Sequence, residues 1–167
     1  AERLGIPCYD SELIQEMEKQ TGFAADYVKE AGEYAPGGFF SSALSTRMFG
    51  PTNEDILWSH QYKVITALAE KGPCVIVGRC ADYILREHPR CVNIFVSASR
   101  EDRIERLVRT RRLTPEAAEQ LMDSTDEKRA DYYNYYSNRT WGAAATYHLC
   151  IDSSVLGIDG TAAFAEE

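Results

Sequence analysis

Short runs of consecutive apolar residues recur along the chain, separated by longer stretches with helical periodicity. The clearest run, at 74–77, follows a Gly-Pro pair and ends at Gly78. An unbroken apolar run of this length is typical of a parallel strand buried on both faces. Similar runs at 6–9, 92–96 and 147–152 predict three more strands.

Helical stripes and capping signals fill the intervals between these runs. Ser99 with Asp102 three residues later, and Thr114 before Pro115, are typical helix beginnings. Gly5 is a typical C-cap for a short helical turn at 1–4, and residues 153–154 are expected to form a turn. Helices are predicted over 12–19, 26–33, 54–70, 100–112, 114–136 and 158–166.

Strands that alternate with helices predict a parallel sheet with helices on both faces, which is a three-layer α/β fold. No internal repeat or low-complexity linker interrupts the pattern. We therefore expect residues 1–167 to form one domain.

Composition and charge narrow the function. The 167 residues carry a net charge of −8, so we expect no broad basic face for a nucleic acid polymer. No apolar run approaches about 20 residues, which argues against a membrane span. The five cysteines are scattered without zinc spacing, so we expect a reduced, cytoplasmic protein that builds no metal site of its own.

Arginines supply the first candidate chemistry. Arg79 follows the run at 74–77, and ligands of open α/β sheets bind at the carboxyl ends of strands. A guanidinium there could grip phosphate, or it could pair with a surface carboxylate. Residues 100–112 hold six arginines against three acidic residues. Arg103, Arg106 and Arg109 recur every third residue and could share a face, although composition alone favours a solvated helix with internal ion pairs.

Asp126 and Arg129 form a second candidate pair. They are three residues apart in a predicted helix, so they are neighbours on one face. The alternative is a simple surface ion pair, worth under about 1 kcal/mol.

Four motifs in series, at 75–85, 93–104, 126–133 and 141–154, resemble the bacterial cytidylate kinase-like proteins, which are P-loop nucleoside monophosphate kinases. The resemblance implies transfer of the ATP γ-phosphate to a nucleoside monophosphate, CMP or dCMP in the first place, with Mg²⁺. It also implies a helical lid over 100–142 and acceptor-side helices and a loop over 20–53. Catalysis of this kind depends on neutralising and positioning phosphates.

The resemblance implies roles for individual residues. Arg79 matches the arginine that holds the acceptor phosphate, while Asp126 and Arg129 match the pair that serves the sugar hydroxyls and phosphate. Ser11 matches a serine of the acceptor site. Lid positions that would reach ATP are occupied by Arg103, Arg106 and Arg109.

Three positions depart from the family pattern. Cys80 stands where an aspartate contacts the base, and a thiol cannot replace its charged acceptors; Asp82 is the candidate substitute. Glu16 and Met122 stand where arginines are expected. These changes leave the preferred base open.

The 167 residues contain no Gly-x-x-x-x-Gly-Lys-[Ser/Thr]. In the family this loop and its strand precede the first helix, so we expect them in a segment upstream of Ala1. That strand lies between those predicted at 74–77 and 92–96. Without it, two half-sheets should each expose an apolar edge.

Two alternatives therefore stay open. One is a small-molecule kinase of the same fold with another acceptor. The other is a nucleotide-binding module without turnover.

Overall fold

The computed structural model describes residues 1–10 and 53–166, and side chains from residue 58 onward in the second range. Ser11, the helices predicted at 12–19 and 26–33, and the expected acceptor-side region at 20–52 lie outside the described residues. The elements are η1 (Glu2–Leu4), β1 (Cys8–Tyr9), α4 (Asn53–Lys71), β2 (Val75–Ile76), α5 (Ala81–Ile84), β3 (Ile94–Ser97), α6 (Arg100–Arg111), α7 (Pro115–Ser137), η2 (Ala144–Thr146), β4 (Leu149–Asp152) and α8 (Ser153–Phe164).

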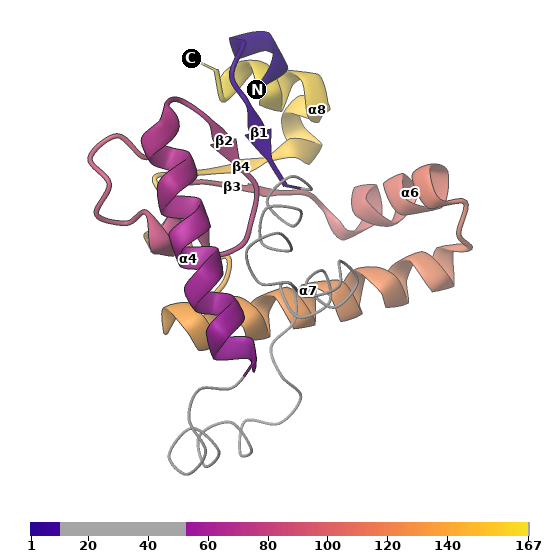
Figure 1. The fold of residues 1–167 in the computed structure, drawn as a ribbon. Helices are drawn as coiled ribbons and strands as arrows, with labels where there is room; N and C mark the ends of the chain where they lie inside the picture. The colour runs from indigo at the N-terminus through magenta and orange to yellow at the C-terminus, as the bar shows by residue number, and fades with distance from the viewer. Residues whose placement is uncertain (11–52, 167) are drawn as a thin grey trace.

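The four described strands form two separate parallel pairs (Figure 1). Strand β1 pairs with β2 with Cys8 opposite Val75. Strand β3 pairs with β4 from Ile94 opposite Leu149 to Ser97 opposite Asp152. The prediction of α/β structure with parallel strands is confirmed. The expectation of a single sheet is not met by the described residues, because no backbone hydrogen bonds join β2 to β3 among them.

Both sheets leave apolar side chains in solvent. Val77, which follows β2, is 48% exposed, and Val96 in β3 is 53% exposed. The prediction that 74–77 is buried on both faces is therefore wrong for Val77. The described residues pair β2 on one edge only, so this end of the run lacks a neighbouring strand.

The capping residues in the sequence predicted the beginnings of α6 and α7 correctly. The Ser99 hydroxyl accepts from the Asp102 amide at 3.1 Å, and the Thr114 hydroxyl accepts from the Ala117 amide at 3.3 Å. Helix α8, however, begins at Ser153, where a turn was expected. Its cap is the Asp152 carboxylate, which accepts from the Ser154 amide at 2.9 Å.

Two clusters form the described core. Val64, Ile65 and Leu68 of α4 pack with α5, and a second cluster joins Cys80 to Tyr132 and Tyr133 of α7. Together they fix the segment after β2 between α4 and α7. Helix α6 and the beginning of α7 extend away from the sheets, whereas the end of α7 lies beside α4 (Figure 1). No described helix has the length and apolar character needed to cross a membrane.

Candidate functional site

The segment after β2 is an unusual turn. Gly78, Arg79 and Cys80 have φ values of 70°, 59° and 53°, so three consecutive residues adopt the left-handed conformation. Glycine adopts it freely, whereas a non-glycine residue in such a region costs on the order of 1–3 kcal/mol. The surrounding structure must therefore hold Arg79 and Cys80 in place.

Gln61 of α4 supplies that support. Its side chain is fully buried, and its Nε2 donates to the Arg79 carbonyl oxygen at 2.8 Å. The Tyr132 hydroxyl of α7 donates to Gln61 Oε1 at 3.1 Å. Burial raises the pKa of Tyr132, so its hydroxyl remains a donor at neutral pH. One hydrogen-bonded chain thus runs from α7 through α4 to the turn.

Arg79 lies at the carboxyl end of β2, as predicted from the sequence. The residue is 8% exposed, which is rare for an arginine. Arginine has the planar fork of donors that matches a phosphate, and the end of a parallel strand is where ligands of such sheets bind.

Cys80 ends the turn that holds Arg79, and Asp82 follows in the first turn of α5. Burial and the nearby Asp82 charge raise the pKa of the Cys80 thiol, so it stays protonated. Asp82 accepts a hydrogen bond from the Tyr133 hydroxyl through Oδ2 at 2.6 Å. Asp82 is therefore held in position by α7, with one of its oxygens already bonded.

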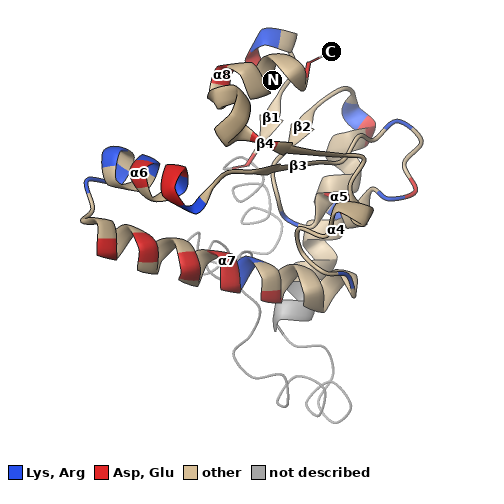
Figure 2. Ribbon diagram, turned by 180° about the vertical axis from the view of Figure 1, so that it is seen from behind, with Lys and Arg blue, Asp and Glu red and all other residues tan. Residues whose placement is uncertain are grey.

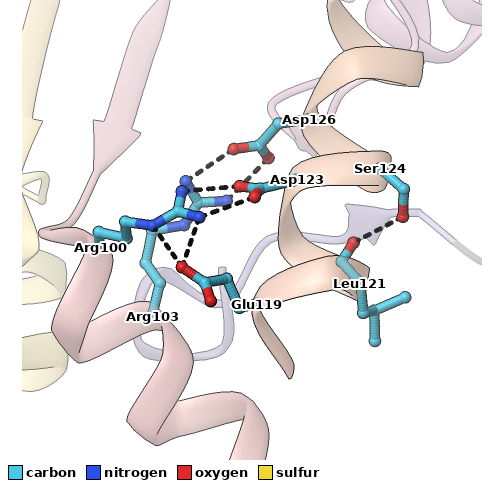
Figure 3. A network of polar contacts seen from close by, with 7 residues as sticks. All are labelled: Arg100, Arg103, Glu119, Leu121, Asp123, Ser124 and Asp126. Atoms are coloured by element: carbon cyan, nitrogen blue, oxygen red, sulfur yellow. Dashed lines mark hydrogen bonds and ion pairs between the residues drawn. The ribbon is translucent and has the colours of Figure 1, made fainter. Parts of the chain in front are cut away.

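Ion pairs join α6 to α7 (Figure 3). The Arg100 guanidinium contacts Glu119 at 2.8 Å and Asp123 at 2.7 Å. Arg103 binds both oxygens of Asp126, with Nη1 and Nη2 each at 2.7 Å. Figure 2 shows the acidic residues that recur along α7. Arg100 and Arg103 therefore do not form the ion pairs within α6 that the alternative expected, because they pair across the hairpin.

The structure thus brings together Arg103 and Asp126, for which the resemblance implied different ligands. Within the described ranges Arg129 is exposed and forms no ion pair with Asp126, so that simple surface pair is not present. Arg106 and Arg109 are exposed on α6 and have no carboxylate partner among the described residues.

Sequence reasoning missed Gln61 and its partner Tyr132. The signal was present, since Gln61 shares a helical stripe with Val64, Ile65 and Leu68 at spacings of three, four and seven. A polar residue on a stripe that becomes buried must find hydrogen-bond partners. The carboxylates that Arg100 contacts carried no comparable signal.

The described residues fit phosphate better than a metal ion. Cationic side chains occur at the turn after β2 and along α6. No group of three or more His, Cys, Asp or Glu in the described part of the chain could hold a metal. A Mg²⁺ ion would therefore have to be held largely by the phosphates of a bound nucleotide.

Comparisons with known proteins identify the family of this chain and a similar solved structure. The profile of the cytidylate kinase-like family matches residues 1–155, which confirms the resemblance drawn from the motifs. The chain is also similar to the crystal structure of an uncharacterized protein from Eubacterium ventriosum ATCC 27560. That match has a TM-score of 0.72 and 23% sequence identity, and it covers 99% of this chain and 83% of that chain. No protein of curated function matches.

Proposed function

The chain belongs to the cytidylate kinase-like family, and from this membership we propose that the full gene product transfers the γ-phosphate of ATP to a nucleoside monophosphate, CMP or dCMP in the first place. An acceptor phosphate oxygen would attack the γ-phosphorus while the bond to the β–γ bridging oxygen breaks. ADP and a nucleoside diphosphate would leave. Mg²⁺ would enter with ATP and help neutralise the phosphates.

The observation that carries this proposal is the buried Arg79 in its left-handed turn. Three elements converge on that turn, since Gln61 of α4 and Tyr132 of α7 hold the backbone that follows β2. Strain that the surroundings hold in place is typical of functional sites. We assign Arg79 to the acceptor phosphate.

The remaining roles follow from position. Asp82 would face the base, because Tyr133 fixes its carboxylate beside the turn. The region 100–142 would act as a lid, with Arg103, Arg106 and Arg109 toward ATP phosphates. Asp126 would bind the sugar hydroxyls and Arg129 a phosphate, and Ser11 would line the acceptor site. In this arrangement Arg103 must exchange Asp126 for phosphate when the nucleotides bind.

The proposal includes the three-layer sheet. A further strand between β2 and β3 would join the two described pairs and cover Val77 and Val96, which are about half exposed. Such a strand would present the phosphate-binding loop beside Arg79.

The test is a coupled assay of ADP formation by the full product of the gene. CMP, dCMP, UMP, AMP, shikimate and gluconate serve as acceptors. We expect turnover with CMP or dCMP to exceed that with every other acceptor. Preferred turnover with shikimate or gluconate would identify a different small-molecule kinase.

Asp126 gives a finer test. If its carboxylate accepts from the ribose 2′-hydroxyl, Asp126→Asn should raise the KM for CMP more than that for dCMP. Equal losses on both acceptors would limit Asp126 to its ion pair with Arg103.

A second candidate is a nucleotide-binding module without turnover. It is favoured by the protonated Cys80 thiol in place of a base-contacting carboxylate and by the partners already held by Asp82 and Asp126. Binding of CMP and ATP with no ADP formation would establish this candidate.

A further inference from the structure

A hollow of about 350 Å³ opens beside α5, outside the residues assigned to phosphoryl transfer. Four segments converge on it: the segment after α5, the segment before β3, the segment after α7, and the stretch from η2 to β4. Its lining residues are Arg86, Asn93, Arg139, Ala145, Thr146 and His148.

Two arginines of the lining, Arg86 and Arg139, both place their guanidinium groups against the ring of Tyr83. The Arg86 guanidinium carbon lies 4.4 Å from the centre of the Tyr83 ring, and that of Arg139 lies 5.4 Å from it. Arg86 Nη1 also donates to the Tyr83 carbonyl oxygen at 2.8 Å, which fixes the orientation of the fork. Stacking on a ring holds a guanidinium without neutralising its charge.

Two carboxylates lie near this hollow: Glu87 beside Arg86, and Asp82, outside the lining, whose Oδ2 accepts from the Tyr133 hydroxyl. Arg86 Nη2 lies 3.6 Å from the carboxylate of Glu87, whose side chain is 87% exposed. A pair so open to solvent is weak. Arg139 has no carboxylate partner among the described residues, and the lining includes no acidic residue.

The neutral side chains of the lining also present donors. The backbone N–H of Asn93 donates to His148 Nδ1 at 2.9 Å. Nδ1 is therefore an acceptor, and the proton of the neutral ring lies on Nε2. The side-chain oxygen of Asn93 accepts from the Cys91 thiol at 3.2 Å. The NH₂ group of the same side chain is the donor at its other end. Such a set of donors and cations, with no lining carboxylate, is complementary to an oxyanion.

We propose that this hollow binds a small phosphate-bearing anion, separately from the acceptor and ATP sites. Arg86 and Arg139 supply the forks that match phosphate oxygens, and His148 Nε2 and Asn93 Nδ2 supply further donors. Two cations beside one hollow, on a chain of net charge −8, favour the approach of an anion there. The site does not depend on kinase turnover.

The imidazole of His148 provides a local probe. Inorganic phosphate is titrated into the protein while the ring signals of its three histidines are followed by NMR. Replacement of each histidine by glutamine assigns the signals. We expect phosphate to move the His148 signal along a saturable curve and to leave His60, on α4, unchanged. A His148 signal that does not respond overturns the proposal.

Variants separate this site from the others. Arg86→Gln and Arg139→Gln should each weaken phosphate binding at His148 by about tenfold, as expected for a charged hydrogen bond. Arg90→Gln removes an exposed arginine from the same connection and should have no effect. Arg79→Ala should also leave this binding unchanged. Circular dichroism and the melting temperature verify that each variant is folded.

Unchanged binding in both Arg86→Gln and Arg139→Gln would overturn the assignment. Citrate, tested in the same way, separates phosphate from carboxylate anions. Saturation of the His148 signal by citrate at lower concentration than by phosphate would likewise overturn the assignment to phosphate.

Discussion

Gln61 shows how one buried side chain can hold a functional backbone conformation. Its Nε2 donates to the Arg79 carbonyl oxygen, and its Oε1 accepts from the Tyr132 hydroxyl. Its loss would leave the Arg79 carbonyl and the Tyr132 hydroxyl buried without their partner. Each such group carries a desolvation cost that water cannot relieve.

Gln61→Met should therefore lower the free energy of unfolding by about 1–3 kcal/mol. Lys63→Met, at an exposed position of the same helix, should change it by no more than about 0.5 kcal/mol. Urea unfolding followed by circular dichroism measures both. Equal stabilities for the two variants would contradict the role given to Gln61.

Arg79 carries the prediction most specific to the proposed activity. In the full gene product, Arg79→Ala should impair use of the acceptor far more than binding of ATP. Arg79→Lys should restore only part of the loss, because a point charge cannot reproduce the planar fork. Steady-state kinetics with varied CMP and varied ATP separate the two effects. Wild-type kcat and KM for the acceptor would show the assignment to be wrong.

At the scale of residues, the sequence correctly predicted that Arg79 lies at the carboxyl end of a strand. The apolar run marks the strand, and Gly78 marks the turn that precedes Arg79. The sequence could not place the partner of Asp126. Arg103 is 23 residues away, and its contact depends on how α6 turns back onto α7. Sequence spacing predicted Arg129 as the neighbour, whereas the hairpin geometry selected Arg103.

Helices α6 and α7 are defined at their ends by local chemistry and held together by charge. Ser99 and Thr114 cap them as the sequence predicted, and Arg112 with φ of 55° ends α6. Helix α8 was placed too late. Its cap, Asp152, belongs to the end of β4, and Gly157 with φ of 67° and ψ of 173° kinks the helix and interrupts its pattern.

The pair between Arg100 and Asp123 predicts how the hairpin responds to pH. The hydrogen bonds from Arg100 hold the pKa of the Asp123 carboxyl below its ordinary value of 3.8. Because the pKa is lower in the folded state, the ion pair stabilises the hairpin above about pH 3.8. This stabilisation is lost as the pH falls through the pKa of Asp123 in the folded protein. Because the group is exposed, the effect should be confined to the hairpin.

Hydrogen exchange of the α6 amides, expressed as protection factors, measures this effect. We expect protection in wild type to decrease on acidification below about pH 3.8, and Arg100→Gln to have low protection already at neutral pH. Arg111→Gln, in the last turn of the same helix, is the matched control and should behave like wild type. Identical protection in all three proteins would show that the ion pairs do not hold the hairpin closed.

At the scale of the whole molecule, alternation of strands and helices predicted parallel pairing, and both described pairs are parallel. It could not predict which strands pair. Partner choice depends on contacts far apart in the sequence, such as Ile94 with Leu149, which no local pattern encodes. The expectation of two half-sheets came from the family resemblance, and the described strands follow it.

The separate half-sheets lead to a prediction for the 167 residues expressed alone. They contain no Gly-x-x-x-x-Gly-Lys-[Ser/Thr], so the backbone cradle and lysine for the β- and γ-phosphates are absent from them, as is the hydroxyl that helps hold Mg²⁺. Each half-sheet also has an edge without a partner strand in the described structure. We expect this polypeptide to unfold over a broad temperature range or aggregate, and to form no ADP from ATP with any acceptor. Calorimetry and the coupled assay measure these properties. A soluble polypeptide that melts sharply and phosphorylates a nucleoside monophosphate would contradict both the need for a joining strand and the need for that cradle.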